Sequence, residues 1–412
     1  MSELINNREY RQKQLKNIIG KLHQGKSVDE VKDEFEKLTE GISSSEIAEM
    51  EQALVEEGMP IEEIQRLCDV HAAVFKGSIE DIHKPLELKK ISGHPVQTFY
   101  LENREIEKLI NEKINKDLEN FKEEDSQDNT HKLLEDIRSL LEINNHYSRK
   151  ENLIFPFMEK YGIVTPPKVM WGVDDEIRAG IKDVKNRLSN HDNHQNNQKR
   201  EAFAKQIEDM ISRIKEMIYK EENILMPMVI DTLSEDEWKI IDKDSDEIGY
   251  CLMKPEGKWQ VDKKEIDKTS LSNKKILEND TIPLDVGSLK ICELNAMLNT
   301  LPIDITFVNK EGLVSYFSQS KERIFARTRS VIGRAVTNCH PPASIHIVEQ
   351  IVKDLTSGKK DHEDFWIKMG DKFAYIRYFA VRDQQGEFLG IVEVTQDIKE
   401  IKALEGEKRL MS

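Results

Sequence analysis

The sequence predicts a multidomain protein, in which an all-α N-terminal region and a four-helix bundle are followed by an α+β domain. Its 412 residues exceed what one hydrophobic core usually supports, so two or three domains are expected. Residues 150–156 (KENLIFP) and 221–227 (EENILMP) end two long amphipathic patterns in nearly the same way. Such a repeat is typical of a bundle built from two related helical hairpins. From Ile305 onward, the helical period gives way to short strands.

The composition excludes several classes of protein. Charged residues make up 33% of the chain and the net charge is −16, which argues against a nucleic-acid binder with a basic face. No run of about eighteen apolar residues occurs, so no membrane-spanning helix is expected. Residues 1–8 lack the apolar segment of a signal peptide. The cysteines have no paired spacing, which fits reduced thiols in the cytoplasm; they are Cys68, Cys251, Cys292 and Cys339.

Residues 1–78 are predicted to form a helical domain. The patterns SVDE at 27–30 and SSSE at 43–46 are capping boxes, in which serine caps free N–H groups and glutamate reaches back to the chain. Cys68 and His71 lie three residues apart and would share a helix face, as metal ligands can. No second pair lies nearby, so an ordinary helix face is the preferred interpretation.

Residues 79–235 carry four helical patterns, which predict the bundle. Prolines at 166–167 separate the second pattern from the third, and polar runs at 123–130 and 190–197 predict solvated loops. The fourth pattern has the i, i+3, i+4, i+7 spacing of a core-facing helix, with Phe203, Ile207, Met210, Ile211, Ile214 and Ile218.

The remaining chain is predicted to be a connector at 236–284, with a hairpin from Tyr250 to Trp259, and an α+β domain at 285–400. The expected elements of that domain are a hairpin of strands at 305–308 and 313–317, a helix at 344–355, and strands at 365–369, 373–382 and 388–395.

Several strings give the chain a family resemblance. They are GHP at 93–95 with Glu102 and Asn103, the two endings KENLIFP and EENILMP, MWGVDDEIR at 170–178, and NCHPP at 338–342. On these strings, the middle region resembles the hemerythrin-like (HHE cation-binding) four-helix bundles. The last 110 or so residues resemble a PAS sensor domain. The N-terminal segment is similar to a domain of unknown function that often precedes such bundles.

The resemblance implies a metal site inside the bundle. Hemerythrin-like sites use inward-pointing histidines and carboxylates, which hold two irons and leave room for a small gas. The implied metal ligands, in order of preference, are His94, Glu221, Asp174 and His146.

The sequence also departs from the family's pattern. Lys150 stands where a glutamate is expected, Asp174 where the third helix usually has histidine, and Met217 where the fourth does. His146 and Glu151 point about 140° apart on a regular helix, so both face inward only with a bulge. Three alternatives therefore stay open, namely a di-iron site, a single non-haem metal or haem iron, and a bundle without metal.

The PAS-like region is expected to supply a sensing pocket. Cys339 and His340 lie in a loop where such domains often hold ligands, and His346 follows on the next helix, so these three are the candidate cofactor-binding residues. An unliganded PAS fold that acts as a dimer or partner surface is the alternative. Trp366, Tyr375 and Tyr378 are expected in the core of the sheet.

Together these features predict a cytoplasmic sensor or regulatory protein that couples a metal-, gas- or redox-responsive bundle to a PAS domain. An iron-dependent enzyme acting on nitric oxide or peroxide, an iron store and a metal-free scaffold are the alternatives, and an enzyme is less favoured. The sequence contains no recognisable output domain. The expected output is therefore a protein partner or self-association, with neither nucleic acid nor membrane as a partner.

Overall fold

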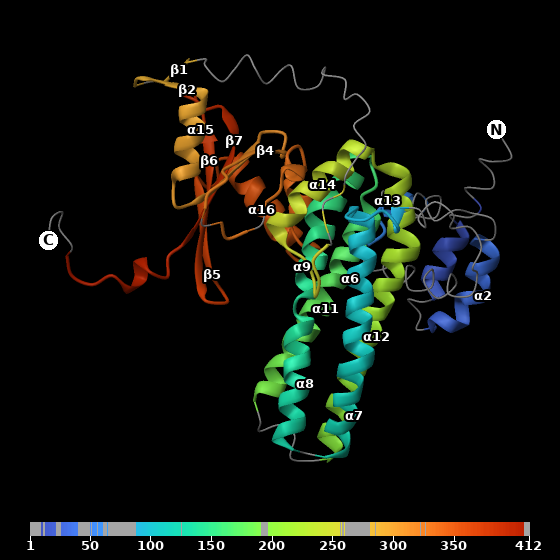
Figure 1. Cartoon of the computed structure of the whole chain (residues 1–412). Coiled ribbons are helices and arrows are strands. Elements are labelled where there is room, and N and C mark those ends of the chain that lie inside the picture. Colours follow the sequence, from blue (N-terminus) through green and yellow to red (C-terminus); the bar gives the residue numbers. More distant parts are fainter. Residues whose placement is uncertain are drawn as a thin grey trace. The chain divides into compact units, whose positions relative to one another are not determined.

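The computed structural model divides into two compact units, Met1–Gln260 and Val261–Ser412, and each is described by itself (Figure 1). The structure describes residues 10, 13–21, 26–39, 50, 52–55, 57–60, 64, 88–124, 126–190, 197–255, 257, 259, 281–284, 286–321, 323–325 and 327–407. The helical region followed by an antiparallel five-stranded sheet confirms the predicted fold class.

The N-terminal region contains α2 (Val28–Thr39). The backbone N–H of Ser27 donates to the Glu30 carboxylate at 2.8 Å, which is the reciprocal half of the expected capping box. A small apolar core joins this region to the bundle, formed by Leu15, Ile18, Ile19, Val31, Met50, Leu54, Ile64 and Val169. The second expected capping box, at 43–46, and the Cys68–His71 pair lie outside the described residues.

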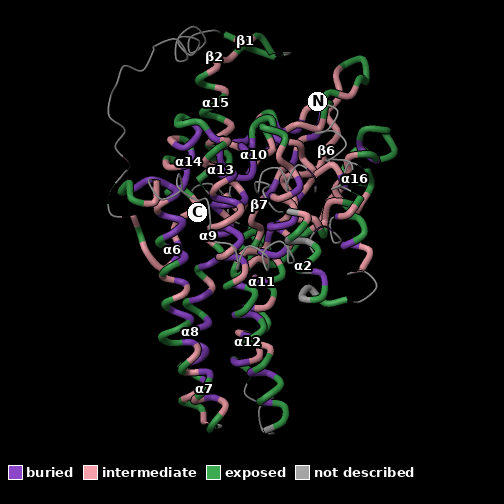
Figure 2. The backbone as a smooth tube through the Cα atoms, turned by 90° about the vertical axis from the view of Figure 1, so that its right-hand side faces the viewer, coloured by how far each residue is buried: buried purple, intermediate pink, exposed green. Residues whose placement is uncertain are grey.

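Four helical rods form the bundle, and most of them are built from consecutive helices. The first rod contains α6 (Pro95–Leu109) and α7 (Asn115–Glu123), and the second contains α8 (Gln127–Leu140), α9 (Ile143–Arg149) and α10 (Phe155–Lys160). The third rod is α11 (Thr165–Ser189), and the fourth contains α12 (Asn197–Lys220) and α13 (Met226–Thr232). Buried positions run along the rods (Figure 2). The apolar stripe of α12 lies in the core, as its spacing predicts.

Widened π-helical turns interrupt three of the rods, at Ile110–Ile114, Lys150–Ile154 and Glu221–Leu225. The last two coincide with the repeated sequence motif. In each, the N–H that follows the turn donates to a carbonyl five residues back, from Phe155 to Lys150 and from Met226 to Glu221. The π turn after His146 is the bulge that allows both His146 and Glu151 to be buried.

The repeated asparagine has the same role in both copies. The side-chain amide of Asn152 donates to the carbonyl of Ser148 at 2.8 Å, and that of Asn223 donates to the carbonyl of Tyr219 at 2.8 Å. These bonds supply an extra donor where the π turn changes the helical hydrogen-bond register. The prolines of the motif occupy the first turn of the following helices, α10 and α13, where a missing N–H is tolerated.

The expected connector begins with another helix of the first unit. α14 (Glu235–Ile248) opens with a complete capping box between Ser234 and Glu237, and Gly249 with φ 92° ends it. Trp238 and Ile241 of α14 are part of the bundle core. The described residues of the expected hairpin (250–255, 257 and 259) are irregular rather than stranded, so that prediction was wrong.

The second unit is an α+β domain with a five-stranded antiparallel sheet in the order β4-β3-β7-β6-β5. Its elements are β1 (Thr281–Pro283), β2 (Ser288–Lys290), α15 (Ile291–Thr300), β3 (Asp304–Asn309), β4 (Val314–Phe317), α16 (Ile345–Thr356), β5 (His362–Met369), β6 (Lys372–Arg382) and β7 (Phe388–Asp397). Short 3-10 turns at Arg329–Val331, Val336–Cys339 and Pro342–Ser344 connect β4 to α16. The predicted hairpin, helix and three strands are all present.

The register of the sheet sorts its side chains into two faces. Glu393 on β7 pairs with Thr306 on β3 and with Tyr378 on β6, so these three lie on one face. Trp366 pairs with Tyr375 and is 63% exposed, so its expected place in the core was wrong. The alternation of the strand directs Trp366 to the opposite face from its neighbour Phe365.

Candidate functional site

Charged side chains from all four rods meet inside the bundle. Every member of this buried charge cluster is at most 1% exposed: Glu102 on α6, His146 and Arg149 on α9, Lys150 at the start of the first repeated π turn, Asp174 on α11, and Glu221 at the start of the second. The π turns matter for this arrangement, because they rotate the helix ends so that these positions point inward.

His146 lies between two carboxylates. Its Nδ1 is 2.7 Å from Oε2 of Glu102, and its Nε2 is 2.9 Å from Oε2 of Glu221. Burial alone would lower the pKa of His146, but the charge of Glu221 and the hydrogen bonds to both carboxylates outweigh it and raise the pKa to about 9. The imidazole is therefore protonated at neutral pH and donates from both nitrogens.

Lys150 lies between the carboxylates of the third and fourth rods. Its Nζ donates to Oδ1 of Asp174 at 2.8 Å and to Oε1 of Glu221 at 2.5 Å. Burial alone would lower the pKa of Lys150, but Asp174 and Glu221 outweigh it and raise the pKa. Burial would raise the pKa of Glu221, yet Lys150 and His146 lower it to about 2. The pair of Lys150 and Glu221 is consequently charged at neutral pH.

Arg149 closes the other side of the cluster. Its Nη2 donates to Oε2 of Glu102, and its guanidinium lies 4.7 Å from the ring centroids of both Phe99 and Tyr250. The second oxygen of Glu102 accepts from the backbone N–H of Cys251 at 2.7 Å. Glu102 is thus held by an arginine, a histidine and a backbone amide, which satisfies a carboxylate without a metal ion.

Beside the cluster, Arg178 of α11 binds the Glu151 carboxylate with both terminal nitrogens, at 2.7 and 2.8 Å. Glu151 is therefore satisfied by a bidentate arginine pair. The sequence predicts that the burial of Glu151 requires a bulge, but it does not predict that an arginine is the partner of Glu151.

The residues present do not fit the iron site of the parent family. Metal ligation needs deprotonated carboxylates and a neutral imidazole, whereas both nitrogens of His146 are committed to carboxylates. The ammonium of Lys150 occupies the place between Asp174 and Glu221 that a cation would take. Within the described parts of the chain, no three His, Cys, Asp or Glu side chains are arranged to hold a metal ion.

The first-ranked ligand candidate, His94, does not join the cluster. It caps the start of α6, where its Nδ1 accepts from the backbone N–H of Val96 at 3.1 Å. Its ring packs against Trp238 and Trp259, with centroid distances of 5.2 and 4.4 Å. Glu102 lies eight residues further along the helix, about 12 Å at 1.5 Å per residue. Burial lowers the pKa of His94 to about 4, so it is neutral.

The structure thus brings together three of the four predicted ligands and adds three residues that the ligand prediction left out. In the sequence, Lys150 was noted only because it replaces the glutamate that the family's pattern has at this position. Glu102 lies three residues after Phe99 and four before Ile106, on the buried stripe of α6. A carboxylate on an apolar stripe is the signal that could have identified it. Arg149 carries no comparable signal in the sequence.

The second unit contains a smaller polar group on the inward face of its sheet. Glu393 is buried; its carboxylate lies 3.4 Å from Nη2 of Arg327 and accepts from the Thr395 hydroxyl at 3.2 Å. Tyr378 is its neighbour on β6. Burial, with the charge of Glu393 next in importance, raises the pKa of Tyr378, which stays a neutral phenol.

His340, a predicted cofactor residue, lies near this group. Its Nδ1 is 2.8 Å from the carbonyl of Val336, so Nδ1 carries the proton and Nε2 keeps its lone pair. Burial lowers the pKa of His340, with Arg327 acting in the same direction. Cys339 packs against the apolar core of this unit, and its Sγ is 3.5 Å from the carbonyl of Ala335. His346 is exposed on α16, so the structure does not bring it to the other two.

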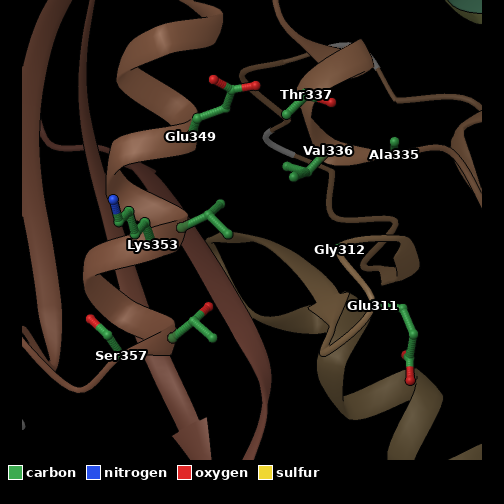
Figure 3. Close-up of a pocket in the computed structure, with 10 residues that line it drawn as sticks. Glu311, Gly312, Ala335, Val336, Thr337, Glu349, Lys353 and Ser357 are labelled. Atoms are coloured by element: carbon green, nitrogen blue, oxygen red, sulfur yellow. The ribbon is translucent and has the colours of Figure 1, made fainter.

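A groove of about 500 Å³ lies beside α16 (Figure 3). One side is formed by α16, with Glu349, Lys353 and Ser357, and the other by the turn at Glu311 and Gly312 together with residues 335–337. None of the predicted cofactor residues lines it. The described helices of the chain also include none with the length and apolar character needed to cross a membrane.

Comparison with known proteins agrees with these two units. Residues 15–81 match a family of unknown function (DUF438), residues 94–229 match the hemerythrin HHE cation binding domain, and residues 294–399 match a PAS domain. No curated protein matches the chain.

Among solved structures, the chain is similar to a C-terminal domain from Streptococcus mutans, with 38% identity, 31% of this chain and 99% of that chain covered, and a TM-score of 0.30. It is also similar to a PAS domain from Colwellia psychrerythraea (14% identity, 27% and 98% covered, TM-score 0.22). A sensory box sensor histidine kinase from Vibrio cholerae gives 9% identity, 25% and 88% covered, and a TM-score of 0.20.

The three matched segments follow one another in the order that the sequence motifs imply, and the charge cluster lies within the second of them. The chain therefore contains, in this order, segments that match the DUF438 family, the hemerythrin HHE cation binding domain and a PAS domain.

Proposed function

We propose that this protein is a cytoplasmic sensor or regulatory protein whose PAS domain binds the signal, and whose hemerythrin-like bundle is a metal-free helical scaffold. Hemerythrin-like and PAS domains together fit a sensing or signalling role. The charge cluster favours the metal-free scaffold among the alternatives for the bundle, because each of its carboxylates is already paired with a cationic side chain of the protein. The signal is passed on to a protein partner or to a second copy of the chain.

The observation that carries this proposal is the polar interior of the PAS domain. One buried apolar cluster of the domain consists of Val308, Val314, Phe317 and Val331. Further buried apolar residues are Leu355, Ala374, Ile376 and Ile391. Glu393, Thr306 and Thr395 are buried on the inward face of the same sheet. Buried polar groups are costly unless they are hydrogen-bonded or paired, and a buried carboxylate near a histidine whose pKa is lowered by burial is typical of a binding site.

The chemistry of the lining defines the class of signal. Glu393 accepts hydrogen bonds, Arg327 donates them, and His340 offers the lone pair of Nε2. A small polar molecule with both donor and acceptor groups satisfies such a set better than an apolar one.

Mass spectrometry of the small molecules released from denatured full-length protein tests this proposal. We expect one polar compound to be enriched in the wild-type protein and lost from the Glu393→Gln variant. Glu387→Gln is the matched control, because Glu387 is exposed in the turn that precedes β7. An equal compound profile for wild type and both variants, with all three folded by circular dichroism, would contradict the proposal.

A further inference from the structure

Lys150 and Glu221 hold the same place in the two repeats of the bundle. Each is the first residue of its motif, KENLIFP or EENILMP, and each is the first residue of a π turn. Their side chains point toward each other from two different rods, and Nζ of Lys150 is 2.5 Å from Oε1 of Glu221. The position that carries a carboxylate in the second repeat therefore carries an ammonium group in the first.

The groups around this ammonium are metal-ligand types. Asp174 is 2.8 Å from Nζ, and its other oxygen, Oδ2, is buried without a hydrogen-bond partner among the described residues. Glu221 connects Lys150 to His146, and His146 connects onward to Glu102. Asp174 and Glu221 at this ammonium, with His146 hydrogen-bonded to Glu221, are groups of the kinds that bind a divalent transition-metal ion. A glutamate in place of Lys150 would add a further carboxylate to them.

Electrostatics requires a cation at this point. Buried carboxylates are strongly unfavourable without an opposite charge, and Glu221 is 1% exposed. The chain supplies this cation covalently from Lys150, which is itself 0% exposed. A metal ion that entered the cluster would have to displace the ammonium and leave it buried without a partner.

We propose that Lys150 is a built-in cation that replaces the metal ion of the bundle, and that exchanging it for a carboxylate opens a site for one divalent transition-metal ion. The wild-type bundle then excludes metal, whereas the Lys150→Glu bundle requires it. This inference rests on the metal-free bundle of the proposed function, but it does not depend on what the PAS domain binds.

The test uses full-length wild type, Lys150→Glu, and Lys150→Glu with Glu221→Gln. Each is stripped with a chelator and loaded with Fe²⁺ under anaerobic conditions or with Zn²⁺, and bound metal is measured by elemental analysis. We expect no stoichiometric metal in the wild type and about one ion per chain in Lys150→Glu. The second substitution removes a ligand and is expected to abolish most of that uptake.

The melting temperature of the helical transition, followed by circular dichroism, gives an independent readout. Wild-type melting is expected to be unchanged by metal or chelator, while Lys150→Glu melts lower without metal and recovers when either ion is added. Lys160→Glu is the matched control, because it makes the same charge change on α10 at a side chain that is 64% exposed and outside the charge cluster. It is expected to take up no metal.

Two results would overturn the proposal. One is stoichiometric metal in the wild-type protein that Glu221→Gln removes. The other is a folded Lys150→Glu variant that takes up no ion. If Lys150→Glu fails to fold with and without metal, Lys150→Asp carries the same test, since it supplies the carboxylate on a shorter side chain. Metal uptake by a folded Lys150→Asp supports the proposal, and its absence overturns it.

Discussion

At the scale of single residues, the bundle is organised by charges that have no access to solvent. Glu102 is the most connected of them, since Arg149, His146 and the backbone of Cys251 all bind it. Such a group contributes little net stability compared with an apolar residue of the same shape, but its partners depend on it. Removing one member leaves an opposite charge buried alone.

The Glu102→Gln variant tests this dependence. We expect a loss of about 3–5 kcal/mol of stability, because Arg149 stays buried without its carboxylate. Glu107→Gln on the same helix is the control; its partner Arg104 is half exposed, so a change below about 1 kcal/mol is expected. Urea unfolding of the helical signal measures both. Equal effects of the two substitutions would show that burial of the ion pair is irrelevant.

His146 gives the bundle a defined pH dependence. Its folded pKa is raised from 6.5 to about 9, so its stabilising contribution is complete below pH 6.5 and is lost as the pH rises through 9. Glu221 behaves oppositely, because its pKa is lowered to about 2: its contribution is present above pH 4.5 and is lost as the pH falls through 2.

Comparison of wild type with His146→Gln isolates the contribution of His146 to the free energy of unfolding. The difference in free energy of unfolding between the two proteins is expected to shrink by roughly 3 kcal/mol as the pH rises from about 6 to about 10. This is the free energy that corresponds to the upward shift of the His146 pKa. Urea unfolding at several pH values measures it. A difference that stays constant over this range would show that His146 is neutral in the folded bundle.

Much of the cluster could be predicted from the sequence, but not its chemistry. The family resemblance implies His146, Asp174 and Glu221 as ligands, and the structure places them within one hydrogen-bonded network. Whether a carboxylate meets a metal or an ammonium depends on which residue of a distant rod faces it. Helical spacing fixes the direction of Lys150 but does not reveal that Glu221 lies 2.5 Å away.

At the scale of elements, the π turns explain why the sequence repeats itself. Each motif combines a charged residue that faces inward, an asparagine that binds a carbonyl four residues earlier, and a proline at the start of the next helix. The motif was recognised as a helix ending, whereas the rods continue through it with a change of register. Hydrophobic period alone does not distinguish a widened turn from a stop.

The asparagines provide a test of the π turns. Asn152→Ala and Asn223→Ala are each expected to cost about 1 kcal/mol of stability, since each removes one hydrogen bond to a backbone carbonyl. The double variant is expected to show the sum, because the sites lie on separate rods. Ser189→Ala is the control: its hydroxyl binds a carbonyl four residues back on an exposed regular helix, so its effect is expected to be near zero.

At the scale of the whole molecule, two units with cores of their own make up the chain. The order of helical region, bundle and sheet domain was predictable because helical and strand periods differ along the sequence. The extent of the first unit was not: α14 looks like the polar start of a connector, yet Trp238 and Ile241 place it in the bundle core. Two apolar residues on a charged helix do not reveal from the sequence which surface the helix packs against.

Separate expression tests this division. Fragments 1–260 and 281–412 are each expected to fold, because each contains its own buried cluster and, in the second, a complete five-stranded sheet. Circular dichroism should show a mainly helical spectrum for the first fragment and a strand-rich spectrum for the second. A random-coil spectrum for either fragment would mean that it depends on the rest of the chain.

The ammonium of Lys150 has a consequence for how the protein matures. A cofactor must be delivered by the cell, can be lost to a competing chelator, and varies in supply with growth conditions. A positive group that belongs to the polypeptide is delivered by translation itself, in a fixed ratio of one per chain. Under the proposal made above, the bundle is complete as soon as it folds, in iron-starved and iron-replete cells alike.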